Sequence, residues 1–422
     1  MNPSDVTFHR IVAAFGLFAM IGFAWLLSSH KKRFPWRVVI GGLVLQLSLV
    51  SLILGTVKGR QLFQWMGAAF ETVLGFVDEG CKLVFGDNFT EFYFAFRVLP
   101  TIIFFSSLMA VMYHLGVMQF VVRLLAKVLQ YSLKTSGAES LSAAANIFVG
   151  QTEAPFVVRP YIATMTNSEL MAIMTGGFAT VAGGVMALYI GWGINAGHLM
   201  TASVISAPAG LLIAKIILPE TGTPVTSGGA NTDIPIESVN VIEAATLGAS
   251  EGLKLALNVA AMLIAFMALI ALADFLLSSS TLWVMNSILG MDVEAGISFS
   301  LITGYLFSPI AWLMGIEWKE CLPAGELLGW KMFANELVAY DKMRGMIGSD
   351  GVAAVISERT TIIMTYALSG FSSFASIGIQ VGGIGGLCPE RRTDLARLGL
   401  RAMLGGTLAC CMTACVAGVV VG

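Results

Sequence analysis

Charge is scarce in this sequence. Only 12% of its 422 residues are Asp, Glu, Lys or Arg, whereas soluble proteins carry about 25%. The net charge of −2 gives no sign of a nucleic-acid partner. The four histidines are scattered and the six cysteines lack metal-ligand spacing, so no metal constellation of an enzyme stands out. The chain is instead 56% hydrophobic.

Long apolar runs recur from end to end and indicate an all-α polytopic membrane protein. The 46 glycines suit membrane helices that pack closely or break. In the first run the basic residues follow the apolar stretch, which is the reverse of a signal peptide and indicates a retained helix. We predict eight spanning helices, at residues 9–28, 38–57, 94–114, 168–190, 197–217, 253–276, 356–380 and 398–420.

Two further apolar regions, at 138–165 and 318–344, are interrupted by Glu, Gln, Asn and Pro. Irregular backbone at membrane depth is tolerated only inside protein or beside a water-filled cavity. We therefore expect two re-entrant hairpins. Residues 117–127 carry charges four apart and suit a helix at the membrane interface, although a packed core helix is an alternative. Residues 59–85 suggest a similar helix on the opposite face.

Basic residues follow the first and third spans and lie between the seventh and eighth. If these clusters are cytoplasmic, both the N-terminus and the C-terminus lie outside. The loop at 221–237 has no Lys or Arg and weakly opposes its predicted cytoplasmic side.

The two interrupted regions resemble each other. Residues 137–141 echo 324–328, each region then carries an Asn and a Glu, and each precedes a glycine-punctuated span. By the predicted orientation the regions enter from opposite faces. Paired, interrupted segments in inverted repeats point to a transporter's midplane site, although chance similarity in glycine-rich sequence remains an alternative.

The first polar cluster is Asn146, Gln151, Thr152 and Glu153. A carboxylate at membrane depth costs about 2.5–3.5 kcal/mol on insertion scales, so it is usually kept for a ligand, an ion or a proton. Pro155 prevents a regular helix and leaves backbone groups free. Free carbonyls suit Na⁺ and free N–H groups suit polar ligand atoms. The structural alternative is an ion pair between Glu153 and Arg159.

The second cluster is Asn335 with Glu336, for which the alternative is an ion pair with Lys331 or Lys342. Two carboxylates without a fixed basic partner favour an uncharged substrate rich in hydrogen-bond donors. Sugar hydroxyls and base amides fit this description, and an anion does not.

Residues 150–155, 335–340 and 365–371 resemble the concentrative nucleoside transporters, and the similarity extends over nearly the whole chain. The resemblance implies a secondary transporter, not an enzyme, that imports nucleosides with Na⁺ and needs no organic cofactor. It also implies a homotrimer in the bilayer of the bacterial inner membrane, in which a transport domain moves against a scaffold.

The resemblance divides the chain into five parts. Scaffold helices 1–3 occupy 1–115, and a first transport half with an interfacial helix, a hairpin, a broken helix 4 and helix 5 occupies 116–217. A cytoplasmic loop follows at 218–252, and scaffold helix 6 at 253–294. The second transport half, with an interfacial helix, a hairpin, a broken helix 7 and helix 8, occupies 295–422.

The resemblance also assigns roles to residues. Asn335 and Ser373 belong to the expected site, but Ser373 stands where family members often have an Asn that contacts ribose, so a direct bond there is in doubt. The remaining residues expected at the nucleoside are Gln151, Thr152, Glu153 and Val185 at the base, Glu336 at the ribose, and Phe371 and Ser376 beside them. Na⁺ would be bound by backbone carbonyls of Asn146, Val149, Thr180 and Val181 and by the Thr180 hydroxyl.

These residues favour Na⁺-coupled nucleoside import by alternating access, in which Na⁺ orders the first hairpin. The nearest alternative is the same fold coupled to protons, with Glu153 or Glu336 titrating. A membrane-embedded hydrolase using both carboxylates and a passive channel are more distant alternatives.

Overall fold

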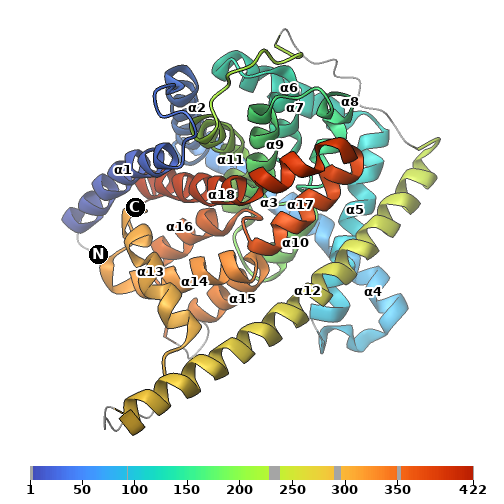
Figure 1. The fold of residues 1–422 in the computed structure, drawn as a ribbon. Helices are drawn as coiled ribbons and strands as arrows, with labels where there is room; N and C mark the ends of the chain where they lie inside the picture. The colour runs from blue at the N-terminus through green and yellow to red at the C-terminus, as the bar shows by residue number, and fades with distance from the viewer. Residues whose placement is uncertain (1–2, 93, 228–237, 289–295, 349–352, 422) are drawn as a thin grey trace.

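The computed structural model describes residues 3–92, 94–227, 238–288, 296–348 and 353–421. All regular elements within these ranges are helices (Figure 1). The two ends of the chain lie beside each other, and Arg10 Nη2 donates to the carbonyl oxygen of Val420 at 3.3 Å. Both termini therefore lie at the same end of the molecule, although the side of the membrane that they face stays a prediction.

Within the described ranges, seven helical segments are long and apolar enough to cross a bilayer, counting the interrupted segment Asn167–Gly191 as one, and they coincide with seven of the eight predicted spans. The eighth, predicted at 356–380, is divided into two helices that are each too short to span alone. The unbroken spans begin with α1 (Pro3–Leu26), α2 (Trp36–Gly55) and α5 (Leu99–His114), and continue with α11 (Ala196–Ile217), α12 (Val241–Trp283) and α18 (Arg392–Val420).

The predicted spans 168–190 and 356–380 are both broken. The first consists of α9 (Asn167–Ala179) and α10 (Gly183–Gly191), and the second of α16 (Glu358–Leu368) and α17 (Phe374–Leu387). The glycine-punctuated spans of the sequence therefore mark real interruptions of the helical backbone.

The two interrupted regions also fold as helix, break and helix. The first comprises α7 (Gly137–Ala145), a turn, a 3₁₀ segment (Ala154–Val158) and α8 (Arg159–Ile162). The second comprises α14 (Cys321–Phe333) and α15 (Glu336–Met346), which are separated by Ala334 and Asn335.

The connecting helices are amphipathic or short. In α6 (Val117–Leu133), Val122 and Leu129 are buried whereas Phe120 and Tyr131 are exposed, so the helix predicted at 117–127 has two different faces, and its place at the membrane interface remains a prediction. The region predicted at 59–85 forms α3 (Val57–Gly75) and α4 (Val77–Phe85), and α13 (Phe299–Leu313) precedes the second interrupted region.

Helix α12 corrects one boundary. It begins at Val241, where Asn240 accepts a bond from the Glu243 N–H at 2.9 Å, so residues 241–252 are helical rather than the end of the loop predicted at 218–252. The charged residues of this stretch lower its hydropathy, so the stretch was predicted as loop. It is held as helix by packing, since Gly248 and Gly252 lie directly against α5. Residues 228–237 of the loop and 289–295 beyond α12 lie outside the described residues.

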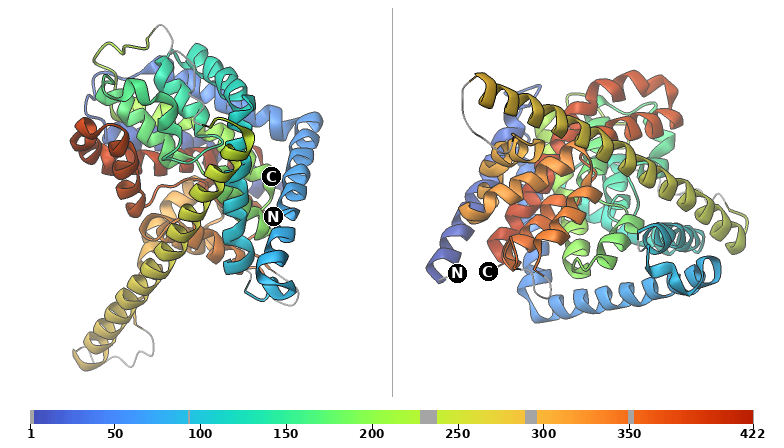
Figure 2. Two further views of the ribbon diagram at one scale, coloured as in Figure 1. Left: turned by 90° about the vertical axis from the view of Figure 1, so that its right-hand side faces the viewer. Right: turned by 90° about the horizontal axis from the view of Figure 1, so that it is seen from below.

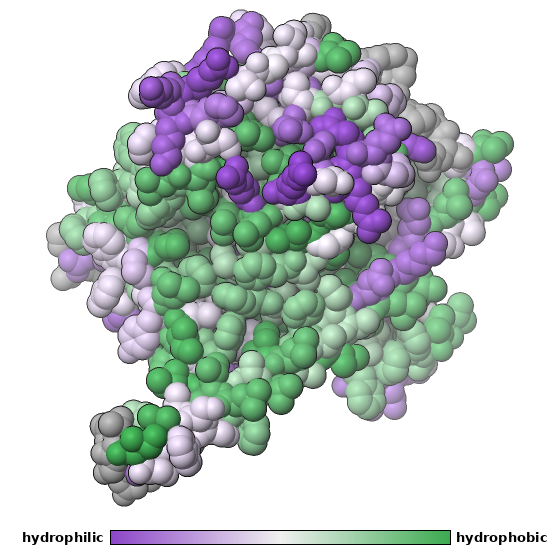
Figure 3. All heavy atoms as spheres, in the orientation of Figure 1, coloured by the Kyte–Doolittle hydropathy of each residue, from purple (hydrophilic) through white to green (hydrophobic). Residues whose placement is uncertain are grey.

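The surface fits a lipid environment. Figure 3 shows hydrophobic residues over the middle and lower part of one face, with hydrophilic residues gathered towards its top. Helix α12 runs obliquely along the molecule and extends beyond its body (Figures 1 and 2). Leu257, Ile264 and Phe275 of this helix are exposed, and such a surface is stable only against lipid or another protein chain.

The interior is built on α9, α11 and the C-terminal part of α18 from residue 402 onward, which pack on one another and are largely buried. One ion pair is buried with them: Lys215 Nζ of α11 lies 2.7 Å from Glu139 Oε2 of α7. Lys215 also donates to Ser168 Oγ of α9 at 3.0 Å. This lysine therefore ties the first interrupted region to two helices of the interior.

We predict that Lys215→Met lowers the free energy of unfolding by about 3–5 kcal/mol, because it leaves the Glu139 charge buried without a partner. Lys319→Met is the matched control, since Lys319 pairs with Glu317 at 2.9 Å but is 68% exposed. Denaturant titration in detergent should show a large loss for Lys215→Met and none for the control. Equal stability of the two variants would contradict the structural role of Lys215.

Candidate functional site

The two helix breaks meet in the interior. The Phe371 N–H, in the break between α16 and α17, donates to the Thr180 carbonyl, in the break between α9 and α10, at 3.3 Å. Gly370 makes this approach possible, because a Cβ there would lie 2.6 Å from the Phe178 carbonyl oxygen and 3.0 Å from the Ala179 carbonyl carbon. Real Cβ atoms almost never approach within 3.0 Å of such atoms. The breaks are thus joined by backbone, with no side chain between them.

The turn that follows α7 in the first interrupted region is hydrogen-bonded to the elements beside these breaks. The Phe148 carbonyl accepts the N–H of Gly183, the first residue of α10, at 3.0 Å. The Ile147 carbonyl accepts Ser203 Oγ of α11 at 2.6 Å. Two consecutive carbonyls of the turn are therefore used to hold it against α10 and α11.

Other carbonyls at this junction remain open. Those of Asn146, Val149 and Val181 accept no hydrogen bond from any residue that the structure describes. The Thr180 carbonyl retains one lone pair beside its bond to Phe371. The Thr180 hydroxyl donates to the Gly176 carbonyl at 3.0 Å, so its own lone pairs are also free.

The side chain of Asn146 is a further group at this junction that could bind a ligand. Its side chain is only 1% exposed, and both Oδ1 and Nδ2 lack a hydrogen-bond partner among the described residues. A buried polar group left in this state costs about 1–3 kcal/mol. The four residues predicted to bind Na⁺ thus belong to two adjoining elements, and their unused carbonyls and the Thr180 hydroxyl offer oxygen atoms. Oxygen ligands of this kind are suited to a hard cation.

Gln151 and Thr152 of the turn lie against α17. Gln380 Nε2 of α17 donates to Gln151 Oε1 at 3.0 Å. Gly383 of the same helix faces Thr152, since a Cβ on this glycine would lie 2.8 Å from Thr152 Cγ2. Gln380 was not among the residues predicted from the sequence, although a glutamine in an apolar, glycine-rich helix was the available signal.

Glu153 is exposed, and no ion pair within 4 Å joins it to Arg159, which is itself exposed. The ion-pair alternative for this carboxylate is therefore not supported. A Cβ at Gly150 would meet Glu153 Oε2, the far end of this flexible side chain, which could move aside.

The Asn335–Glu336 pair occupies the start of α15. Asn335 Oδ1 accepts the Val338 N–H at 2.9 Å, so Asn335 is the N-cap. Glu336 is 4% exposed, and its Oε2 has no hydrogen-bond partner within the described ranges. A carboxylate in the first turn is favoured by the helix dipole, but this oxygen remains available to a ligand.

Neither basic residue suggested by the sequence pairs with Glu336. Lys331 Nζ donates to the Ala367 carbonyl at 2.7 Å, and Lys342 Nζ lies over the Trp330 ring, 5.2 Å from its centroid. Glu336 is therefore a buried carboxyl group without an ion-pair partner in the described part of the chain.

Tyr189 is a second residue that the sequence did not predict for the site. Its ring stacks on Tyr340 of α15 with centroids 4.1 Å apart, and its hydroxyl is buried without a partner among the described residues. Tyr189 lies one helical turn after Val185 and thus on the same face of α10. Eight tyrosines in the chain gave no reason to select this one.

Ser373 and Ser376 bond to each other. Ser373 is the N-cap of α17: its Oγ accepts the Ser376 N–H at 3.4 Å and lies 3.0 Å from Ser376 Oγ. Phe371 is half-buried in the same break. The structure thus joins the first turn and both helix breaks, but no hydrogen bond or ion pair of the described residues links Glu336 to Gln151, Thr152 or Glu153.

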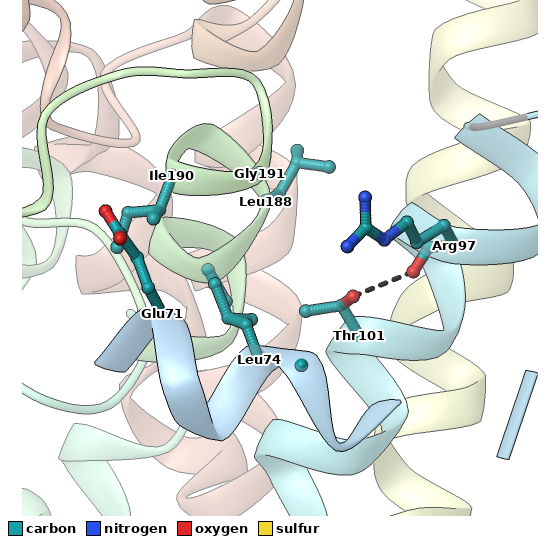
Figure 4. Close-up of a pocket in the computed structure, with 9 residues that line it drawn as sticks. Glu71, Leu74, Arg97, Thr101, Leu188, Ile190 and Gly191 are labelled. Carbon is teal, nitrogen blue, oxygen red and sulfur yellow. Dashed lines mark hydrogen bonds between the residues drawn. The ribbon is translucent and has the colours of Figure 1, made fainter. Parts of the chain in front are cut away.

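A separate pocket of about 190 Å³ lies outside this group of residues, between α3, α5 and α10. Figure 4 shows Glu71 and Leu74 on one wall and Arg97 on another, with Thr101 donating to the Arg97 carbonyl. Arg97 also forms a two-pronged ion pair with Asp78 at 2.9 and 3.0 Å. None of the residues predicted for the site lines this pocket.

Comparison with known proteins identifies similar sequences over nearly the whole chain. Three family profiles match, described as "Na+ dependent nucleoside transporter C-terminus" at 198–418, "Na+ dependent nucleoside transporter N-terminus" at 15–88 and "Nucleoside recognition" at 95–195. Solute carrier family 28 member 3 of Mus musculus is 42% identical over 97% of this chain and 59% of its own length. The chain thus spans about three fifths of that relative. An uncharacterized transporter of Haemophilus influenzae is 44% identical over 96% of this chain and 97% of its own.

Solved structures of similar proteins have the same fold as this chain. CNTnw in an inward-facing substrate-bound state has a TM-score of 0.87 and 40% identity, covering 98% of both chains. A CNTnw variant in an outward-facing state has a TM-score of 0.88 and 39% identity, covering 97% of both. The fold of this chain is therefore one that has been seen open to either side of the membrane.

We predict that Gly370→Ala separates the two helix breaks, because the added methyl group has no room beside the Phe178 and Ala179 backbone. The expected loss of stability is about 1–3 kcal/mol, as for other overpacked interiors. Thermal unfolding in detergent would measure it. Gly378→Ala is the control, since it lies in α17 with no atom within 4 Å of its Cβ position; if both variants unfold at the wild-type temperature, the close approach is not structurally important.

Proposed function

Because this chain belongs to the family of Na⁺-dependent, concentrative nucleoside transporters, we propose that it imports nucleosides by Na⁺ symport through alternating access. Its relatives are transporters rather than enzymes. The proposal is supported most directly by the open carbonyls of Asn146, Val149 and Val181 beside the orphaned Asn146 side chain.

Sodium ions would join two elements at this junction. Asn146 and Val149 belong to the first turn, whereas Thr180 and Val181 belong to the break between α9 and α10. A cation held by both would fix the turn against the broken helix and offset the cost of their unpaired oxygens. The adjoining Gln151, Thr152 and Glu153 would then be ordered for the nucleobase. Cation binding thus favours nucleoside binding, and linkage makes the effect reciprocal.

The nucleoside would lie between this turn and α15. Val185 would pack on the base, and Glu336 Oε2, which has no partner among described residues, would accept ribose hydroxyls. Asn335 would act mainly by capping α15. Phe371 and Ser376 would lie alongside. Since Ser373 is already bonded to Ser376, we propose that it reaches ribose through water rather than directly.

The same proposal covers the assembly. We place the protein in the plasma membrane of a bacterium with both termini outside, as a homotrimer whose scaffold comprises residues 1–115 and 241–294, the second segment beginning with α12. The remaining two halves, 116–217 and 295–422, would move, with 137–162 and 321–346 as re-entrant hairpins. The exposed apolar face of α12 supports a scaffold surface that meets lipid or a neighbouring subunit.

Proton coupling in the same fold is the second candidate. It is favoured by Glu336, a buried carboxyl group with no ion pair among the described residues, because such a group can exchange a proton as its surroundings change. We favour Na⁺ as the coupling ion, because the carbonyls without hydrogen bonds beside Thr180 can coordinate a metal cation, whereas proton coupling would not use them.

We predict that proteoliposomes containing the protein accumulate labelled nucleoside when an inward Na⁺ gradient is imposed, and not when K⁺ replaces Na⁺. Thr180→Val should raise the Na⁺ concentration for half-maximal uptake about tenfold, since one charge-assisted contact is worth about 1.5–3 kcal/mol. The measurement is initial uptake rate against Na⁺ at constant pH.

Thr175→Val is the matched control. Thr175 lies in α9, the helix that ends just before Thr180, and is fully buried without a hydroxyl partner among described residues, but it faces Gly405 of α18. Its variant should keep the wild-type Na⁺ dependence. Uptake that depends on a proton gradient and not on Na⁺ would favour proton coupling. Uptake that depends on neither gradient would exclude coupled transport.

A further inference from the structure

Gln380 of α17 is fully buried and connects three parts of the site. Its Nε2 donates to Gln151 Oε1 of the first turn at 3.0 Å and to the Met174 carbonyl of α9 at 3.1 Å. Both N–H bonds of this amide are therefore used. Its Oε1 has no donor among the residues that the structure describes.

The chemistry of Met174 determines which way Gln380 faces. A backbone carbonyl can only accept, so the NH₂ group of Gln380 must point towards it. The second hydrogen of that NH₂ group points to Gln151, whose oxygen must then face Gln380. Reversing Gln380 would bring its oxygen against the Met174 carbonyl and lose that bond even if Gln151 reversed as well, at a cost of about tenfold in population.

The amide of Gln151 is fixed in turn. With Oε1 engaged by Gln380, its Nε2 is the atom left for a ligand, and it donates to no described residue. Gly177 of α9 leaves just enough space for this pair, because a Cβ there would lie 2.8 Å from Gln380 Nε2 and 3.0 Å from Gln151 Cβ. Rotation of either amide within this confined space is disfavoured.

We propose that Gln380 is a positioning residue that makes Gln151 a hydrogen-bond donor to the substrate, so that the site selects a nucleobase presenting an acceptor, either a ring carbonyl or a ring nitrogen, at this point. The inference rests on the proposed function, which places Gln151 at the nucleobase. It adds the direction of that hydrogen bond and the residue that sets it.

The experiment compares nucleosides that differ in one acceptor. The panel is uridine with analogues lacking the 2- or the 4-carbonyl oxygen, or adenosine with its 1-, 3- and 7-deaza analogues, according to which parent the wild type transports. Wild-type protein should show a KM about tenfold higher for one analogue of the panel, since one hydrogen bond to the base is lost. If the wild type accepts every analogue as well as the parent, the inference is overturned without any variant.

The variant Gln380→Met removes the amide at similar volume. The parent KM should rise about three- to tenfold with the maximal rate retained, and the penalty for the critical analogue should fall to less than threefold, because the Gln151 amide can then rotate. In a Gln151→Ala background, Gln380→Met should change neither quantity further. A role in packing alone would give additive effects and leave the discrimination unchanged, which would overturn the inference.

Gln46→Met provides a matched control. Gln46 of α2 is also fully buried, donates Nε2 to the Ile205 carbonyl at 3.0 Å and has an Oε1 without a described partner, but it does not contact Gln151. Its variant should keep the wild-type discrimination between analogues. Absence of any nucleoside uptake by the wild type would refute the proposed function, whereas uptake with discrimination that Gln380→Met leaves intact would refute this inference alone.

Discussion

The backbone contact between the two broken helices is the constraint on which the rest of the site depends. Phe371 donates to the Thr180 carbonyl, and Gly370 lies on the last residues of α9. A continuous helix at either position would satisfy its own carbonyls and leave none for a ligand. By breaking both helices where they meet, the chain exposes backbone oxygens in its interior while keeping their positions fixed. Backbone oxygens placed in this way would allow a protein with little charge to bind the proposed cation without carboxylates.

Buried polar atoms without hydrogen-bond partners explain how ligands would stabilise the site. Asn146, Tyr189 and Glu336 each carry buried atoms without a partner among the described residues, and each such group destabilises the protein on its own. They occur on three elements, namely the first turn, α10 and α15. Ligands that satisfy them would stabilise one arrangement of these elements, which is the physical content of coupling between cation and nucleoside.

Much of the fold could be predicted from the sequence, because long apolar runs mark membrane helices directly. Seven spans were predicted in this way, whereas the breaks in the spans at 168–190 and 356–380 were expected only from the resemblance to the transporter family. The start of α12 at Val241 was not, since its early charged residues resemble a loop. Gln380 and Tyr189 were missed because their roles arise from contacts with Gln151 and Tyr340, which are far away in sequence. That one binding site contains both Gln151, Thr152 and Glu153 and the pair Asn335 and Glu336 stays a prediction. The two groups are not bonded to each other in the described part of the chain, and a bound nucleoside would contact both.

The most direct test of this account is Na⁺ binding measured at equilibrium with and without nucleoside. Calorimetric titration of detergent-solubilised protein, with K⁺ holding the ionic strength constant, would give both affinities. The account predicts that saturating nucleoside tightens Na⁺ binding by about 5–150-fold, and that saturating Na⁺ tightens nucleoside binding by the same factor. A Na⁺ affinity that is unchanged by nucleoside would contradict the claim that one junction of broken helices serves both ligands.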